Sequence, residues 1–387
     1  MIILAKLKRT FLSSPHMSGN EQKYIQEAFD LNWIAPLGNN VNGLEKDIAE
    51  YNSIRDAAVV TSGTAAIHLA LRLLNVEEMD TVFCSSLTFV ASANPILYQG
   101  ATPVLIDSEM DTWNMSPQAL ERALREAKEE GHLPKAVIIV NLYGQSAKMN
   151  ELIELCNRYD VPVIEDAAES LGSTYKGQKS GTFGKFGVYS FNGNKIITTS
   201  GGGALVSDEE EALKKARFLS TQARDQAVHY QHSEIGYNYR MSNIVAGIGR
   251  GQMEVLDERV SQKRAVFDRY FEAFGNVEGI EFQPELEDTM SNRWLTALTI
   301  DPEVTGVSRH EVIEKLNEEN IEARPVWKPM HLQPLFDGVT YYPHEEGNSI
   351  ADYLFEYGLC LPSGTNMTVE DQDRVIKLIT NMITGEY

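Results

Sequence analysis

Short apolar runs alternate with amphipathic segments over residues 57–220 of the chain. The apolar runs predict strands, one ending at residues 59–60 and the others at residues 81–85, 102–106, 136–140 and 161–165. The amphipathic segments predict helices at residues 64–74, 90–98 and 149–159, and one more that Ser116 caps before Pro117. Continuous apolar strands suit burial on both faces, so this alternation predicts a mostly parallel sheet covered by helices.

The pattern changes near residue 243. Residues 243–274 have a helical pattern without proline, which predicts one long helix connecting a large domain to a smaller one. The remainder is expected to contain a strand at residues 294–300 and helices at residues 309–319 and 370–383. We therefore predict an N-terminal segment with a large domain over residues 1–245, and a connecting helix with a small domain over residues 246–387.

The start of the chain has four apolar residues followed by alternating basic ones, without the long apolar run of a signal peptide. Ser18 and Glu21 then have the spacing of a capping box before a helix at residues 24–31. No stretch approaches the roughly 20 apolar residues that a transmembrane helix needs. These observations predict a cytoplasmic protein without a membrane span.

The composition, with 43% hydrophobic and 23% charged residues, is that of a globular protein with a sizeable core. The net charge of −21 repels phosphate backbones, so we do not expect nucleic acid as a partner. An anionic small substrate would need a local cluster of positive side chains. Cys84, Cys156 and Cys360 are far apart and form no C-x-x-C pair, which argues against a metal site and a disulfide framework.

Two segments that follow predicted strands contain residues suited to a phosphorylated, nitrogen-containing ring. Parallel sheets bind ligands at the carboxyl ends of their strands. Gly63 and Thr64 begin a helix there, and the free N–H groups of a helix start can hold a phosphate; the alternative is a plain capped helix. Asp166 follows another strand, where its carboxylate can pair with a protonated ring nitrogen; the alternative is a helix cap.

A third segment, SFNGNKIITTSGGG, contains Lys195. A lysine enclosed by protein can form a Schiff base with an aldehyde, although most lysines are solvated surface charges. Ser190 is placed to reach the same phosphate as Thr64, and the glycines at residues 201–203 would allow a tight backbone path beside a flat ring. A phosphate cradle, a carboxylate and a lysine are the contacts that pyridoxal 5′-phosphate requires. The set therefore favours that cofactor.

These segments resemble the DegT/DnrJ/EryC1/StrS sugar aminotransferases, over almost the whole chain from about residue 11. The matching motifs are TSGTAAIHLAL, SSLTFVASANPILYQGATPVLIDSE, VIEDAAESLG, SFNGNKIITTSGGG, GYNYRMSNI and KPMHLQPLF. The resemblance implies the fold-type-I pyridoxal-phosphate transferase architecture, an α/β fold with a mostly parallel mixed sheet, helices on both faces and a smaller C-terminal α+β domain. It also implies a homodimer with shared active sites.

The resemblance assigns a role to each matching residue. Lys195 would be the Schiff-base lysine and Asp166 the partner of the ring nitrogen. Further cofactor contacts would come from residues along the large domain and from the partner subunit: Gly63, Thr64, Phe89, Glu169, Ser190 and, across the dimer, Asn238. Substrate contacts are expected from the early loop, from candidate cations and from the KPMHLQP segment: Trp33, Ile34, Ala35, Arg240, Arg324, Lys328 and His331.

The implied reaction moves an amino group from L-glutamate to C4 of a UDP-linked 4-keto-6-deoxy-N-acetyl sugar, for exopolysaccharide or glycan biosynthesis. Alternatives are amination at C3, a GDP- or dTDP-linked keto-sugar, or a non-catalytic pyridoxal-phosphate-binding regulator. The chain departs from many members at Asn141, Glu169 and Gly202, which bears on fine specificity. Some relatives that act as dehydratases have histidine at the lysine position, and Lys195 argues against that activity.

Overall fold

The computed structural model describes residues 8–385, so the apolar start of the chain, residues 1–4, lies outside the described residues. The large domain is built on an eight-stranded sheet in the order β1-β9-β8-β5-β4-β2-β3-β14. Its strands, in that order, are Asp56–Val60, Gly203–Ser207, Phe186–Ser190, Val163–Asp166, Ala136–Val140, Thr81–Ser85, Thr102–Ile106 and Tyr341–Tyr342. β9 runs antiparallel to β8 and β1, and the other pairs are parallel. The expected mostly parallel mixed sheet is confirmed.

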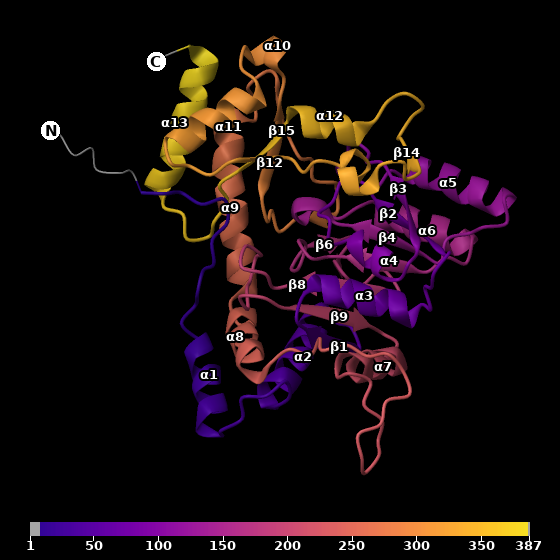
Figure 1. Ribbon diagram of the computed structural model, residues 1–387. Helices are drawn as coiled ribbons and strands as arrows, with labels where there is room; N and C mark the ends of the chain where they lie inside the picture. The colour runs from indigo at the N-terminus through magenta and orange to yellow at the C-terminus, as the bar shows by residue number, and fades with distance from the viewer. Residues whose placement is uncertain (1–7, 386–387) are drawn as a thin grey trace.

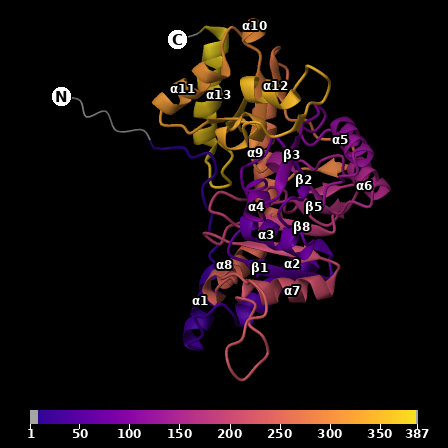
Figure 2. The same ribbon diagram turned by 45° about the vertical axis from the view of Figure 1, so that its right-hand side comes forward.

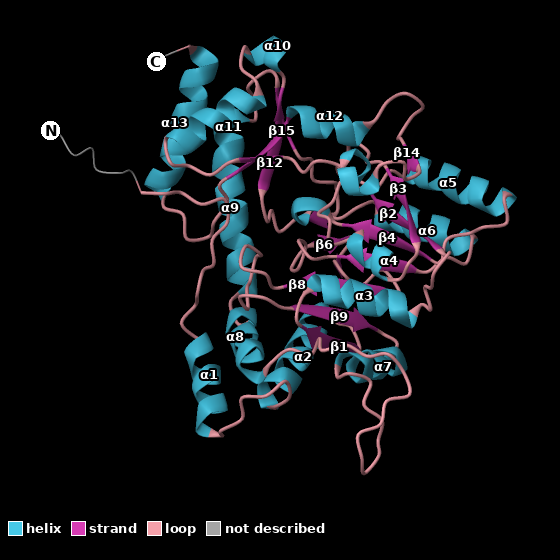
Figure 3. Ribbon diagram, viewed as in Figure 1, coloured by secondary structure: helices cyan, strands magenta, loops and turns pink. Residues whose placement is uncertain are grey.

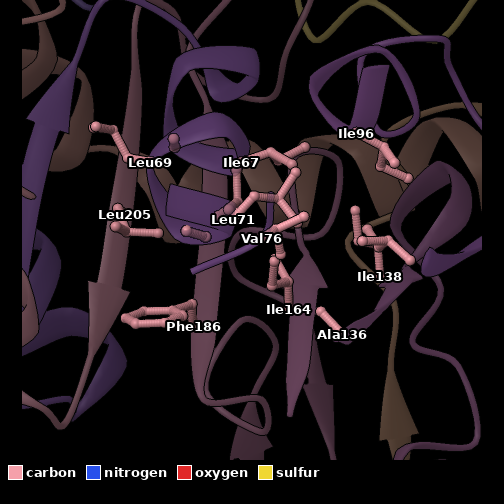
Figure 4. Close-up of a cluster of buried hydrophobic side chains, with 14 of the residues drawn as sticks. Ile67, Leu69, Leu71, Val76, Ile96, Ala136, Ile138, Ile164, Phe186 and Leu205 are labelled. Atoms are coloured by element: carbon pink, nitrogen blue, oxygen red, sulfur yellow. The ribbon is translucent and has the colours of Figure 1, made fainter. Parts of the chain in front are cut away.

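Helices cover both faces of this sheet. Successive residues of a strand point to opposite sides, so both faces present apolar side chains that the helices bury. Ile138 of β4 packs with α3 (Gly63–Leu73), α4 (Asn94–Tyr98) and α7 (Glu210–Ser220), and Figure 4 shows part of this cluster. Ile139, the next residue, packs with α5 (Pro117–Glu129) and α6 (Met149–Arg158). Figure 3 shows the strands enclosed by helices.

The small domain contains a four-stranded antiparallel sheet in the order β10-β12-β15-β13. These strands are Ile280–Phe282, Thr296–Ile300, Gly358–Leu361 and Arg324–Pro325. Its helices are α9 (Leu256–Phe274), α10 (Pro302–Thr305), α11 (Arg309–Glu318), α12 (Ile350–Tyr357) and α13 (Val369–Thr384). Figure 1 shows α9 running from this domain down to the large one. Two strands from the C-terminal part of the chain pair with strands of the large domain. β14 joins the large sheet beside β3, and β11 (Thr289–Met290) pairs with β6 (Thr174–Tyr175).

The predicted single helix over residues 243–274 is wrong. The structure has α8 (Asn243–Met253) and α9 there, separated at Val255, whose φ of −118° and ψ of 11° are not helical. A break of two residues hardly changes the spacing of apolar positions, so the pattern did not reveal it. Glycines of α8 bring other helices close: a Cβ on Gly251 would lie 2.6 Å from the Glu21 backbone nitrogen.

The N-terminal segment differs from its predicted form. α1 spans Glu21–Asp30 and begins three residues earlier than expected, with Asn20 as its N-cap. Glu21 does accept a hydrogen bond from the Ser18 backbone N–H at 2.8 Å, but the Ser18 hydroxyl accepts from Asn20 rather than from residue 21. α2 (Asn39–Asn52) follows and was not predicted. Among residues 8–385, no helix combines the length and the apolar character needed to cross a membrane.

Candidate active site

A cavity of about 380 Å³ lies where the large sheet meets the small domain. β4, β5 and β8 reach it with their carboxyl ends through Val140, Asp166 and Ser190. The start of α3 and the loop before α4 form another wall, and Trp294 and Trp327 contribute from the small domain. The structure thereby brings together these residues singled out from the sequence: Gly63, Thr64, Phe89, Asp166, Glu169, Ser190 and Lys195.

One end of the cavity is the N-terminus of α3. Ser62 caps this helix, since its Oγ accepts a hydrogen bond from the Ala65 N–H at 3.0 Å. Ser190 lies against the helix start, because a Cβ on Gly63 would be 3.2 Å from the Ser190 Cβ. A helix start with an adjacent hydroxyl is a binding site suited to a phosphate. Gly203 of β9 passes so close that its Cβ would lie 2.4 Å from the Gly63 nitrogen, which explains one of the three consecutive glycines.

Asp166 is the last residue of β5 and is buried. Its Oδ2 accepts from the Ser92 hydroxyl at 2.6 Å and its Oδ1 from the Ala168 N–H at 3.1 Å. Thr88 extends this line of hydroxyls, with its Oγ1 2.7 Å from the Ser92 Oγ. Burial raises the pKa of the Asp166 carboxyl, and the Ser92 hydroxyl, the Ala168 N–H and the Lys195 charge act against that rise. A cationic ring nitrogen beside it would stabilise its ionised form.

Lys195 enters the cavity from the loop after β8, and its side chain is 12% exposed. Its Nζ lies 3.3 Å from the Glu169 Oε1 and 4.0 Å from the centroid of the Trp294 ring. The Glu169 Oε2 accepts from the Tyr143 N–H at 2.7 Å. Burial raises the pKa of Glu169 to about 7, although the Lys195 charge and the Tyr143 N–H oppose this. A carboxyl with that pKa can exchange a proton with the amine at neutral pH.

Aromatic rings line another side of the cavity. Phe89 is 55% exposed and its centroid lies 5.6 Å from that of Trp327. Trp327 in turn packs edge-on against Tyr143 at 5.2 Å, and the Tyr143 hydroxyl accepts from the Trp327 N–H at 3.1 Å. Trp294 lies 6.3 Å from Trp327. These contacts cross from the large to the small domain, so the aromatic side is set by how the domains meet.

Several predicted substrate residues lie elsewhere. Arg240 does not line this cavity: its Nη1 is 2.5 Å from the Glu45 Oε1 and 3.1 Å from the Val59 carbonyl, and its side chain is 9% exposed. The guanidinium is thus already paired with a carboxylate of its own chain. The substrate role expected of Arg240 stays a prediction.

His331 is likewise outside the cavity lining, and its substrate-side role stays a prediction. Its Nδ1 lies 2.7 Å from the Ser86 Oγ and its Nε2 2.8 Å from the Asp352 Oδ1, while its ring stacks on Tyr341 at 3.7 Å. Both ring nitrogens thus have partners within the chain. Burial lowers the pKa of His331, and Asp352 opposes that shift.

The remaining candidates lie on the surface. Arg324 is exposed and paired with Glu322 at 2.9 Å, and Lys328 is exposed and outside the cavity lining. The early loop is held at the start of α8, because the carbonyls of Trp33 and Ala35 accept from Asn243. Ile34 between them is exposed.

Asn238 is exposed in the segment between α7 and α8. A loop of this segment extends below the body of the molecule in Figures 1 and 2. Asn238 does not line the cavity of its own chain, so its predicted role across a dimer stays a prediction.

Comparison with known proteins identifies the group to which this geometry belongs. Residues 15–380 match the DegT/DnrJ/EryC1/StrS aminotransferase family. The chain belongs to this family. EpsN of Bacillus subtilis, assigned by its name to the pyridoxal phosphate-dependent aminotransferases, is 64% identical over 375 residues, 97% of this chain and 96% of EpsN. A DegT DnrJ EryC1 StrS aminotransferase from Brucella abortus has a similar structure, with a TM-score of 0.86 and 26% identity over 94% of this chain and 95% of that one. The predicted fold class and transaminase activity are confirmed.

Two further relatives of this aminotransferase have different nucleotides in their names. The GDP-perosamine synthase of Caulobacter vibrioides is 35% identical over 98% of this chain and 100% of the relative. The UDP-4-amino-4,6-dideoxy-N-acetyl-beta-L-altrosamine transaminase of Campylobacter jejuni is 31% identical over 86% of this chain and 87% of the relative. Both names denote sugar nucleotides, and they leave the nucleotide of this enzyme open.

The cavity fits the predicted cofactor, pyridoxal 5′-phosphate. The start of α3 with Ser190 suits its phosphate, the buried Asp166 carboxylate its ring nitrogen, the exposed face of Phe89 its ring, and Lys195 its aldehyde. Of the residues that depart from the family pattern, Glu169 and Gly202 line the cavity, while Asn141 is buried and does not line it. Asn141 bonds to Glu165 at 2.8 Å and to Ser180 at 2.7 Å, so it supports the sheet rather than the ligand.

Proposed function

We propose that this aminotransferase moves an amino group from L-glutamate to C4 of a UDP-linked 4-keto-6-deoxy-N-acetyl sugar, for exopolysaccharide or glycan biosynthesis in the cytoplasm. The observation that carries the proposal is the enclosed amine of Lys195, 3.3 Å from a carboxyl that can exchange its proton. The choice of a UDP-linked sugar rests on the Campylobacter relative and on two segments that resemble enzymes aminating C4 of UDP-linked 4-keto sugars, namely KPMHLQPLF and NWIAPLG at residues 32–38.

Pyridoxal 5′-phosphate, when bound, supplies an aldehyde for amino groups and an electron-withdrawing ring. The chain's own residues would then divide the remaining work. The α3 start and Ser190 bind the phosphate, Asp166 holds the proton of the ring nitrogen, and the Lys195 Nζ moves protons to and from the substrate carbon. Glu169 holds the proton that the Lys195 amine must lose before it acts as a base.

The charges around the cavity support a shared site in a homodimer. Among the described residues that line it, Lys195 is the one cationic side chain, whereas the cofactor phosphate, glutamate and a sugar diphosphate are all anionic. Further donors must therefore come from outside this lining. The segment between α7 and α8 has a loop that extends away from the body of the molecule. Asn238 of this segment is exposed beside Thr221, the residue after α7, and would contact the cavity of a second copy.

A GDP-linked 4-keto sugar is the second candidate substrate, because the GDP-perosamine synthase is the more similar of the two named sugar enzymes. The deciding experiment incubates the enzyme with glutamate, pyridoxal 5′-phosphate and separate UDP-, GDP- and dTDP-linked 4-keto-6-deoxy sugars. Mass and NMR analysis of the product would identify the nucleotide and the aminated carbon. Amination of the UDP-linked N-acetyl sugar at C4 is expected, and a preference for another nucleotide or for C3 would contradict the proposal.

A further inference from the structure

A buried lysine lies close to the active site without lining the cavity. Lys263 is on α9 and is 2% exposed. Its Nζ donates to the Ser363 carbonyl at 2.7 Å, the Trp294 carbonyl at 2.9 Å and the Ser13 hydroxyl at 3.0 Å. All three N–H groups of the ammonium thus have acceptors. Within residues 8–385, no carboxylate forms an ion pair with it, which is rare for a buried charge.

The acceptors come from three separate parts of the chain. Ser13 belongs to the N-terminal segment, Trp294 precedes β12, and Ser363 follows β15. One side chain on α9 therefore joins the beginning, the middle and the end of the chain. An apolar residue would fill the same space without the desolvation of an ammonium.

Two of these acceptor residues also contact the loop that contains Lys195. The Ser13 hydroxyl donates to the Asn194 carbonyl at 2.9 Å, and the Trp294 Nε1 donates to the same carbonyl at 2.7 Å. Asn194 immediately precedes Lys195 in the chain. The Trp294 ring also lies 4.0 Å from the Lys195 Nζ. Lys263 is thus connected to Lys195 through two short paths that meet at one carbonyl.

We propose that Lys263 is a positioning residue for Lys195. Its Nζ holds the Ser13 hydroxyl and the Trp294 carbonyl, so that the Ser13 hydroxyl and the Trp294 indole N–H both donate to the Asn194 carbonyl. This fixes the Lys195 amine between Glu169 and the Trp294 ring. The inference rests on the proposed function of Lys195. It extends that function to a residue outside the cavity, and it gives the N-terminal segment a part in catalysis.

The test compares Lys263→Met, Ser13→Ala and the matched control Gln372→Met with the parent enzyme. Gln372 is also buried against α9, where its Nε2 donates to the Val266 carbonyl at 2.7 Å, but it has no contact with the Asn194 network. Three quantities are measured: thermal unfolding without cofactor, the rate at which Lys195 is labelled by pyridoxal 5′-phosphate and borohydride, and kcat separately from KM.

Loss of positioning would slow labelling of Lys195 and lower kcat in Lys263→Met by about 10- to 100-fold, with KM within about threefold, since small misplacements of a reacting group have effects of that size. Ser13→Ala is expected to show a smaller change in the same direction. In the double variant Lys263→Met/Ser13→Ala, the loss of kcat should be smaller than the two single losses combined, because both changes act on the same path. Gln372→Met should lose thermal stability while its labelling rate stays that of the parent.

The outcomes separate the two proposals. If borohydride does not label Lys195 in the parent protein, the proposed function fails, and this inference fails with it. If the parent is labelled at Lys195 and the Lys263 and Ser13 variants have its labelling rate and kcat, the positioning role is overturned although the proposed function stands. Should Lys263→Met not fold, Ser13→Ala decides alone, because Ser13 is partly exposed and its removal leaves the core intact.

Discussion

The Lys195 amine and the Glu169 carboxylate lie 3.3 Å apart in a cavity that both domains line. Burial raises the pKa of Glu169 to about 7, and the Lys195 charge limits that rise. The Glu169 carboxyl can therefore take up and release a proton near neutral pH, within hydrogen-bond reach of the Lys195 Nζ.

Replacing Lys195 with alanine tests the attachment of the cofactor. Lys195→Ala should lower kcat by at least about 1000-fold, because it removes both the amine that holds the aldehyde and the base that moves the proton. Borohydride reduction followed by peptide mapping should label the parent at Lys195 and leave the variant unlabelled. Lys185→Ala, which changes an exposed lysine paired with Glu209, is the control and should behave as the parent does. A label at another lysine in the parent would refute the assignment.

Glu169→Gln tests the proton exchange. The amide oxygen can still accept from the Tyr143 N–H, but the side chain no longer takes up a proton near pH 7. Since the Glu169 carboxyl loses its proton as pH rises through about 7, the parent should show an acid limb of kcat/KM in that region. We expect the variant to lose this limb and to have a kcat about 10- to 100-fold lower. A pH profile of the variant that matches the parent would show that Glu169 has no part in proton transfer.

Mixing two inactive variants tests the shared site. Lys195→Ala and Asn238→Ala should each be inactive alone if Asn238 completes the partner's site. With random exchange in a two-fold dimer, about a quarter of the sites in a 1:1 mixture combine two intact residues, and about that fraction of activity should return. Exchange is followed by native mass spectrometry of an isotope-labelled chain. Confirmed exchange without recovery would contradict the shared site.

The cofactor residues that the sequence singles out within one chain lie together in the cavity, whereas the expected substrate residues are dispersed outside its lining. Gly63 and Asp166 each lie just beyond the end of a predicted strand, whereas Lys195 follows β8, a strand that was not predicted. Parallel topology gathers such positions at one edge of the sheet. Ser92 was missed because its contact with Asp166 joins residues 74 apart in sequence and depends on the turn before α4. Trp294 and Trp327 were missed because the docking of the small domain places them.

Arg240 also shows that contacts between distant parts of the chain cannot be predicted from a local motif. Its motif and charge suggested a ligand for a diphosphate, but Glu45, 195 residues away in sequence, already occupies its guanidinium. A local pattern shows which residues can do chemistry. It does not show which of them a distant part of the chain will contact, and His331, which contacts Ser86 and Asp352, is a second example.

The buried charge of Lys263 should appear in the pH dependence of stability. Burial lowers the pKa of Lys263 to about 7, against 10.5 for an ordinary lysine. Between these values the unfolded chain binds more protons than the folded one, so this group adds stability as pH rises. From pH 7 to pH 9 the parent should gain about 2 kcal/mol of unfolding free energy relative to Lys263→Met. Urea unfolding of both proteins at several pH values measures this, and a constant difference would mean that Lys263 titrates normally.

Two neighbouring glycines separate backbone packing from ligand binding. A Cβ on Gly203 would lie 2.4 Å from the Gly63 nitrogen and 2.4 Å from the Ser62 carbonyl carbon, so Gly203→Ala must push β9 away from the start of α3. Backbone atoms cannot yield as a flexible side chain does, and we expect a loss of about 2 kcal/mol or more in unfolding free energy together with weaker cofactor binding. Gly201→Ala is the matched control, because a Cβ there meets nothing within 4 Å. Denaturant unfolding without cofactor should leave Gly201→Ala within about 1 kcal/mol of the parent. Equal stability of the two variants would show that β9 can move at no cost and that the phosphate end of the cavity does not depend on this close approach.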